Sequence, residues 1–130
     1  MTSYRTSLGR ARGLGSAKHG VGHFITQRVS AVALVPLGLW ALYSGLTISR
    51  LGFDGALAWL HSPLNAILAI LLAVAATVHM RIGMQEIVED YIHKSSTKRV
   101  LLILNYFVCV LAVATAVFSI LKIALIGAAV

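Results

Sequence analysis

The sequence predicts an all-α integral membrane protein with three transmembrane helices, and its composition and hydropathy pattern support this class. The chain of 130 residues is 58% hydrophobic and only 12% charged, whereas about 25% of residues are charged in a typical soluble domain. Its mean hydropathy is +0.87. The apolar residues gather in three runs, each long enough to cross a bilayer as a helix of roughly 20 residues. A soluble domain this small could not bury so much apolar surface.

Three helices are expected in the membrane, joined by a loop and a turn. The predicted helices cover residues 24–49, 63–93 and 99–126, with a loop at 50–62 and a turn at 94–98. Pro63 opens the second helix, and proline suits a first helical turn because its missing N–H would have no partner there. The chain is thus divided into an N-terminal segment, residues 1–23, and a three-helix membrane domain, residues 24–130.

The net charge of +7 is concentrated near the N-terminus. Residues 1–28 contain five basic side chains, five glycines and no acid. Glycine weakens helices, so this segment is not expected to form a long helix. A basic segment of this kind can lie on anionic lipid headgroups or dock a soluble partner protein. Nucleic acid is not an expected partner.

Basic residues also predict the orientation in the membrane. The N-terminal segment and the turn at 94–98 are basic, whereas the loop at 50–62 has only the cation Arg50 and the C-terminus only Lys122. Three helices place the two basic regions on the same side of the membrane. Because basic loops face the cytoplasm, the N-terminus is predicted to be cytoplasmic and the C-terminus periplasmic.

The stretch from His79 to Tyr91, HMRIGMQEIVEDY, carries most of the candidate chemistry. It follows a long run without charged residues. At about 100° per residue, one face of a helix would carry His79, Gly83, Glu86 and Asp90. Twelve residues separate His79 from Tyr91, a rise of roughly 18 Å. If Tyr91 marks the membrane surface, His79 lies near the midplane of the hydrocarbon core.

A histidine at this depth has three candidate roles. It could pack with its nitrogens satisfied by neighbouring helices, relay protons, or bind a metal, and ionisable residues inside a membrane are usually functional. Imidazole is a common haem ligand, and Gly83 leaves room one turn away for a flat group or a second helix. Low-spin haem normally has two axial ligands, and no other histidine lies at membrane depth. A second ligand would therefore come from another chain.

Residues near the membrane surface also have an ordinary interpretation. Arg28 can be an anchor that reaches lipid headgroups, and Tyr91 can belong to the aromatic belt at the interface. The alternative for Arg28, and for the nearby His23, is a contact with a carboxylate of a bound cofactor, since cations and donors stabilise buried carboxylates.

The same stretch resembles a known family. The pattern H-x-x-I-G-M-x-x-I/V-x-x-D-Y, from His79 to Tyr91, is similar to the small hydrophobic membrane anchor of bacterial succinate dehydrogenase. Residues 20–34, GVGHFITQRVSAVAL, also resemble that family, and the preceding LGRARGLGSAK looks alphaproteobacterial. The resemblance covers most of the chain.

The resemblance implies a b-type haem shared with a companion membrane anchor, a second hydrophobic chain of the same complex. His79 matches the axial histidine for the haem iron, and the other axial ligand would belong to the companion anchor. Arg28 matches an arginine in an R-x-[ST]-A context and His23 lies near a family histidine, so both are candidates for the haem propionates. Arg81 points about 160° away from His79 around the helix and is a less natural partner.

The resemblance also implies a ubiquinone site at the end of the second helix. Tyr91 and Asp90 match the family there: a phenol can donate a hydrogen bond to a quinone carbonyl, and a neighbouring acid can orient it or deliver protons. FAD and iron–sulfur clusters would belong to partner subunits, since a cluster needs about four thiolates and Cys109 is the one cysteine.

The implied protein is an anchor, integral to the bacterial cytoplasmic (inner) membrane, and is not catalytic alone. It would hold the flavoprotein and iron–sulfur subunits, which pass electrons from succinate to ubiquinone in the respiratory chain and the tricarboxylic acid cycle. The protein would bind and orient the cofactors, which carry the electrons.

Two other functions fit the composition. A small multi-helix transporter would use His79, Arg81 and Glu86 as a substrate or proton path. Such a transporter would usually place an acid at mid-helix depth, whereas the acids of the predicted helix at residues 63–93 gather towards one membrane interface. A haem-free structural protein of the same complex would use His79 for a hydrogen bond between helices, and haem content separates it from the anchor with haem.

Overall fold

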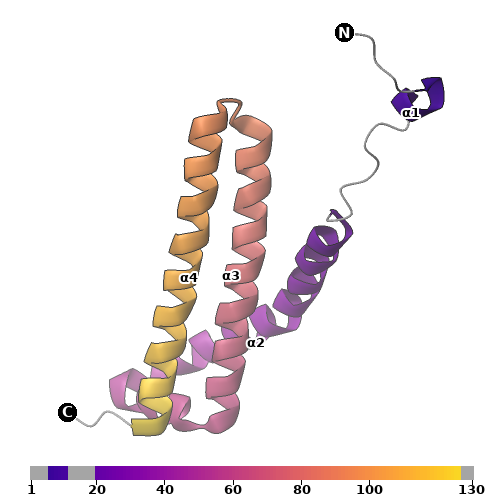
Figure 1. The fold of residues 1–130 in the computed structure, drawn as a ribbon. Helices are drawn as coiled ribbons and strands as arrows, with labels where there is room; N and C mark the ends of the chain where they lie inside the picture. The colour runs from indigo at the N-terminus through magenta and orange to yellow at the C-terminus, as the bar shows by residue number, and fades with distance from the viewer. Residues whose placement is uncertain (1–5, 12–19, 127–130) are drawn as a thin grey trace.

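The computed structural model describes residues 6–11 and 20–126. That part of the chain forms four helices and no strand: α1, Ser7–Ala11; α2, Gly20–His61; α3, Pro63–Tyr91; and α4, Ser95–Ile126 (Figure 1). Helices α2, α3 and α4 are each long and apolar enough to cross a membrane. The predicted all-α class with three membrane helices is therefore confirmed. Most of the predicted N-terminal segment, 1–23, lies outside the described residues.

Helices α3 and α4 lie side by side and antiparallel, joined by a tight turn at residues 92–94 (Figure 1). Helix α2 packs against α3 and also contacts α4. The beginning of α2 comes close to the second half of α3, where Gln27 Nε2 lies 2.9 Å from Glu86 Oε2. The start of the first membrane helix is therefore brought against the part of the second that contains Glu86.

The predicted loop at 50–62 is wrong, because nearly all of this segment is helical. Helix α2 breaks only at Gly52, whose φ of 69° and ψ of −172° are not helical, and then resumes as far as His61. Glycine adopts a positive φ at little cost because it has no Cβ. The break lets the chain turn back until Trp59 stacks on Trp40, with ring centroids 5.5 Å apart. Stacked indoles stabilise the short apolar helix where a surface loop is expected.

Two helix starts also differ from the prediction. Helix α2 begins at Gly20 rather than at residue 24, and α4 begins at Ser95 rather than at residue 99. In α4 the backbone N–H of Lys98 donates a hydrogen bond of 2.9 Å to the carbonyl of Lys94, so helical bonding begins before the expected end of the turn. Such terminal bonds are local and do not follow from hydropathy. Pro63 does occupy the first turn of α3, as predicted.

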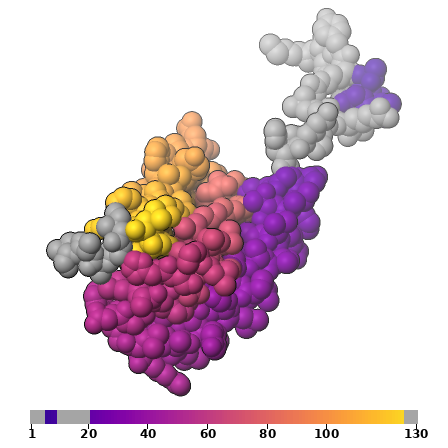
Figure 2. Space-filling view, turned by 90° about the horizontal axis from the view of Figure 1, so that it is seen from below, coloured from indigo at the N-terminus to yellow at the C-terminus, as the bar shows by residue number. Residues whose placement is uncertain are grey.

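The three long helices approach each other through mostly small side chains. Six positions are buried among the residues whose exposure is described: Ser30, Ser44, Ala66, Ile82, Val88 and Cys109. Small residues let helix backbones come close in membrane proteins. Many large apolar side chains lie on the outside of the bundle, where they suit lipid or other membrane proteins. Seen from the end, the magenta segment around the α2–α3 junction covers much of the bundle (Figure 2).

Candidate functional site

A line of polar side chains runs between α2 and α3. Helix α2 contributes His23, Gln27 and Ser30, which are four and then three residues apart and so share one face. Helix α3 contributes His79 and Glu86, two turns apart on the face predicted from the sequence. We call these five residues the polar seam. Polar side chains bond across membrane helices because lipid offers them no alternative partner.

At one end of the polar seam, His79 contacts Ser30. His79 Nδ1 lies 3.2 Å from Ser30 Oγ, and the same hydroxyl lies 2.9 Å from the carbonyl oxygen of Gln27. Ser30 is only 7% exposed, whereas His79 is half-buried. One nitrogen of the imidazole is therefore engaged by α2. Its other nitrogen, Nε2, has no hydrogen-bond partner among the residues that the structure describes.

At the other end of the polar seam, Glu86 contacts two residues of α2. Its Oε2 accepts a hydrogen bond of 2.9 Å from Gln27 Nε2, and its Oε1 lies 3.9 Å from His23 Nδ1. The second nitrogen of His23, Nε2, is buried and finds no partner within the described part of the chain. Leaving a buried polar atom unpaired costs free energy. His23 thus keeps one ring nitrogen that is covered by this chain and has no partner among the described residues.

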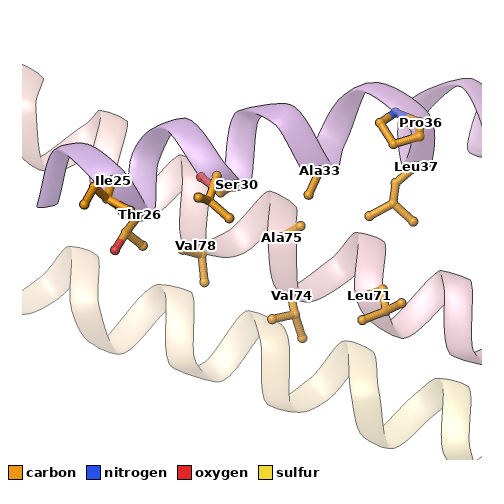
Figure 3. Close-up of a pocket in the computed structure, with 11 residues that line it drawn as sticks. Ile25, Thr26, Ser30, Ala33, Pro36, Leu37, Leu71, Val74, Ala75 and Val78 are labelled. Atoms are coloured by element: carbon orange, nitrogen blue, oxygen red, sulfur yellow. The ribbon is translucent and has the colours of Figure 1, made fainter. Parts of the chain in front are cut away.

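An open apolar groove begins beside the polar seam. It lies between α2 and α3 and has a volume of about 580 Å³. Figure 3 shows its walls, which include Ser30, Ala33 and Pro36 from α2 and Val74, Ala75 and Val78 from α3. His79 does not itself line the groove, but two lining residues connect the groove to it: Ser30 contacts His79, and Val78 precedes His79 in the chain. A flat apolar group could lie along it.

Tyr91 and Asp90 lie apart from the polar seam, at the end of α3. The Tyr91 side chain is 75% exposed, and Asp90 is exposed as well. Neither side chain forms a hydrogen bond with another described residue. Both are therefore available to a ligand or to a second protein at this end of the bundle.

Two arginines singled out by the sequence lie on other helix faces. Arg28 is exposed, and its guanidinium carbon lies 5.1 Å from the centre of the Phe24 ring, a cation–π contact. Arg81 lies on the side of α3 that meets α4, where its backbone carbonyl accepts a hydrogen bond of 2.9 Å from Asn105 Nδ2. This contact involves the backbone of Arg81 and not its side chain.

The metal-binding side chains of the described residues fit the iron of a haem, most of whose ligands come from the macrocycle, better than they fit a bare metal ion. Within residues 6–11 and 20–126, no group of three His, Cys, Asp or Glu side chains could hold a metal ion. A haem iron needs only one or two donors from protein. His79 offers one beside the apolar groove, and a Cβ added to Gly83, one turn on, would meet no atom within 4 Å. The residues present therefore fit a flat macrocycle with one imidazole ligand from this chain.

The sequence pointed to three members of the polar seam but not to Gln27 and Ser30. Histidines and acids are noticed because they titrate and bind metals, whereas single Gln and Ser residues are common in any helix. The spacing of His23, Gln27 and Ser30 on one face of an apolar helix is the signal that could have found them.

Comparisons with known proteins identify the family. A family described as succinate dehydrogenase/fumarate reductase transmembrane subunit matches residues 2–119. A relative from Rickettsia bellii (strain RML369-C), named succinate dehydrogenase hydrophobic membrane anchor subunit, is 32% identical over 100 residues, which are 77% of this chain and 80% of that protein. A relative of the same name from Paracoccus denitrificans is 29% identical over 125 residues, 94% of each chain. No solved structure matches the chain significantly.

The three long apolar helices define an integral membrane protein, and the polar seam forms a polar site between two of them. The chain belongs to the succinate dehydrogenase/fumarate reductase transmembrane subunit family. The resemblance to alphaproteobacterial membrane anchors of succinate dehydrogenase is thereby confirmed. This family membership leaves the small transporter without support.

Proposed function

We propose that this chain anchors the flavoprotein and iron–sulfur subunits of succinate dehydrogenase to the bacterial cytoplasmic membrane. In this proposal the chain also binds a b-type haem through His79. Tyr91 and Asp90 form part of the ubiquinone site. The position of His79 is the observation that carries the proposal. His79 Nδ1 lies 3.2 Å from Ser30 Oγ, and Nε2 has no partner among the described residues. An apolar groove of about 580 Å³ lies nearby.

Haem, when bound, supplies one-electron transfer. In this chain His79 would hold the iron, and Gly83 would leave space for the edge of the ring. His79 is the one histidine of the described residues at this place in the helices, so a second protein ligand to the iron would come from the companion membrane anchor. His23 and Arg28 would contact the propionates. Arg28 lies against Phe24 on another face of α2, so it would reach a propionate only after turning away from that ring.

The ubiquinone site would lie at the exposed end of α3. Tyr91 would donate a hydrogen bond to a quinone carbonyl, and Asp90 beside it would orient the phenol or deliver a proton. The exposure of both side chains supports this role. The rest of the site would come from the companion anchor and the iron–sulfur subunit, which would meet this end of the bundle. The basic flanks of the helices support a cytoplasmic N-terminus.

A reduced-minus-oxidised optical spectrum tests the proposal, recorded on this chain and its partners purified from native membranes. A low-spin b-type haem signal is expected, together with flavin and iron–sulfur subunits in the same preparation. If those partners were present without haem, the anchor role would stand and the His79 ligand would not. A chain that purified alone and colourless would overturn the whole proposal.

One observation favours a second candidate, an anchor without haem. The contact between His79 and Ser30 is a hydrogen bond between helices, and such a bond alone can justify a polar residue inside a membrane. The two candidates differ in the use of Nε2, which would ligate iron in the first and have no partner in the second. The same spectrum decides between them.

A further inference from the structure

We propose that Ser30 is a positioning residue for His79: its hydroxyl keeps the imidazole proton on Nδ1 and so leaves the lone pair of Nε2 for iron. The inference rests on the proposed function, because it concerns the nitrogen that would bind haem. It is carried by two contacts of one buried hydroxyl group and by the hydrogen bond that ties Gln27 to Glu86.

The direction of the Ser30 hydroxyl follows from its two neighbours. Ser30 Oγ lies 2.9 Å from the carbonyl oxygen of Gln27 and 3.2 Å from His79 Nδ1. A hydroxyl has one hydrogen, and a carbonyl oxygen can only accept. The hydrogen therefore points to Gln27, because otherwise two acceptors would face each other at 2.9 Å. The lone pairs of Ser30 Oγ remain available to a donor.

His79 Nδ1 is that donor. In a neutral imidazole one nitrogen carries hydrogen and the other carries a lone pair, and the hydrogen bond of one nitrogen sets the state of the other. Bonding of Nδ1–H to Ser30 thus leaves Nε2 as the nitrogen with the lone pair. Histidines that ligate metals generally donate their other N–H to a fixed acceptor, and Ser30 supplies this acceptor from a different helix.

Ser30 and the group that orients it are both held in place. Ser30 is 7% exposed, so lipid and water have little access to it. Its bond to the carbonyl three residues earlier is a usual one for serine in a helix. Gln27, which provides that carbonyl, is tied to α3 by the hydrogen bond of 2.9 Å from its Nε2 to Glu86 Oε2. The acceptor for His79 is therefore fixed by contacts on both helices.

Three variants separate the hydroxyl from its surroundings. Ser30→Ala removes the acceptor. Ser30→Thr keeps it and adds a methyl group, for which the neighbouring groove has room. Ser49→Ala is the matched control: it removes a serine hydroxyl of the same helix that bonds to the carbonyl three residues earlier, that of Leu46, at 2.9 Å, at an exposed position.

The first measurement is the protonation of each His79 nitrogen, by 15N solid-state NMR on the full chain in lipid bilayers without haem. Spectra are recorded at about pH 8.5, where an ordinary imidazole is neutral, and His79→Gln assigns the signals. We expect Nδ1–H in the wild type, Ser30→Thr and Ser49→Ala. In Ser30→Ala the ratio of Nδ1–H to Nε2–H should fall about two- to tenfold, as loss of one hydrogen bond predicts. An unchanged ratio in Ser30→Ala would overturn the inference.

The second measurement is haem retention by the purified complex, titrated with apomyoglobin as a competing haem binder. Ser30→Ala should release haem about 10- to 100-fold more readily, and Ser30→Thr and Ser49→Ala should match the wild type. Haem that is present but insensitive to Ser30→Ala would contradict the inference while leaving the proposed function intact. A wild-type complex without haem would instead overturn the proposed function.

Discussion

Gln27 of α2 donates a hydrogen bond of 2.9 Å to Glu86 of α3, across a separation of 59 residues in sequence. The contact between Ser30 and His79 lies about one turn further along α2 and two turns away along α3. Two bonds at different levels fix how α2 is rotated relative to α3, since a rotation about either helix axis would break at least one of them. The apolar groove owes its shape to this fixed rotation.

Gln27→Leu should therefore loosen the packing of α2 on α3. Interhelical hydrogen bonds in membrane proteins are worth about 0.5–2 kcal/mol, so the midpoint of thermal unfolding of the purified complex should fall measurably. Gln85→Leu is the control, because Gln85 bonds to Glu89 within α3 on an exposed face, at 2.8 Å. A pair of that kind contributes less than about 0.5 kcal/mol. Equal shifts for the two variants would contradict the structural role of Gln27.

His79→Leu should abolish or weaken the haem absorbance while leaving the chain in the membrane. Leucine has no donor atom for iron, but it keeps the apolar character that insertion requires. The reduced-minus-oxidised spectrum gives the result, with immunoblots of membranes to confirm equal amounts of chain. His61→Leu, an exposed histidine at the end of α2, should change nothing. An unchanged spectrum for His79→Leu would disprove the ligand assignment.

Tyr91→Phe should impair ubiquinone reduction more than succinate oxidation by an artificial acceptor. The variant keeps the ring and loses the one hydroxyl that can donate to a quinone carbonyl, which predicts a loss of about tenfold for one hydrogen bond. The ratio of the two activities in the same preparation is the measurement. Tyr43→Phe, also at an exposed tyrosine, serves as the control. Equal loss of both activities would argue against a quinone role.

Gly52→Ala should destabilise the chain by about 1–3 kcal/mol, the usual cost of forcing a side chain into a strained backbone conformation. The destabilisation would come from the φ of 69° at Gly52 and not from a steric clash, since a Cβ there would meet no other atom within 4 Å. Gly45→Ala is the matched control: its Cβ also meets nothing, and its backbone is helical. Thermal unfolding should show a lower midpoint for Gly52→Ala alone. A fall of the same size for Gly45→Ala would show that the break carries no strain.

The predicted orientation can be tested with cysteines at the two ends of the bundle. In a Cys109→Ala background, Ser96→Cys in the first turn of α4 should react from the cytoplasmic side with a maleimide that does not cross membranes. Asp54→Cys, just beyond the break in α2, should react from the periplasmic side. Both positions are exposed. Labelling of Ser96→Cys in intact spheroplasts, without permeabilisation, would mean that the orientation is reversed.

Hydropathy was sufficient to predict the class of this protein and the approximate extent of its membrane helices. Long apolar runs must form helices in lipid, because every backbone N–H and C=O has to be satisfied within the segment. The break at Gly52 escaped prediction, since glycine also occurs inside membrane helices, as Gly45 does here. Whether a given glycine adopts a positive φ depends on what its neighbours pack against, here Trp59 on Trp40.

Residue chemistry singled out His79 as a candidate, and helical periodicity was sufficient to place it on one face with Glu86 and to give its rise relative to Tyr91. These are properties of a single helix, whose rise and rotation per residue are constant. Tertiary structure alone decides that Ser30 and Gln27 are the partners of that face. The bonded residues are 49 and 59 positions apart, and such pairs depend on how two helices are rotated and shifted against each other. That arrangement is set by the packing of small side chains along the whole contact between the helices.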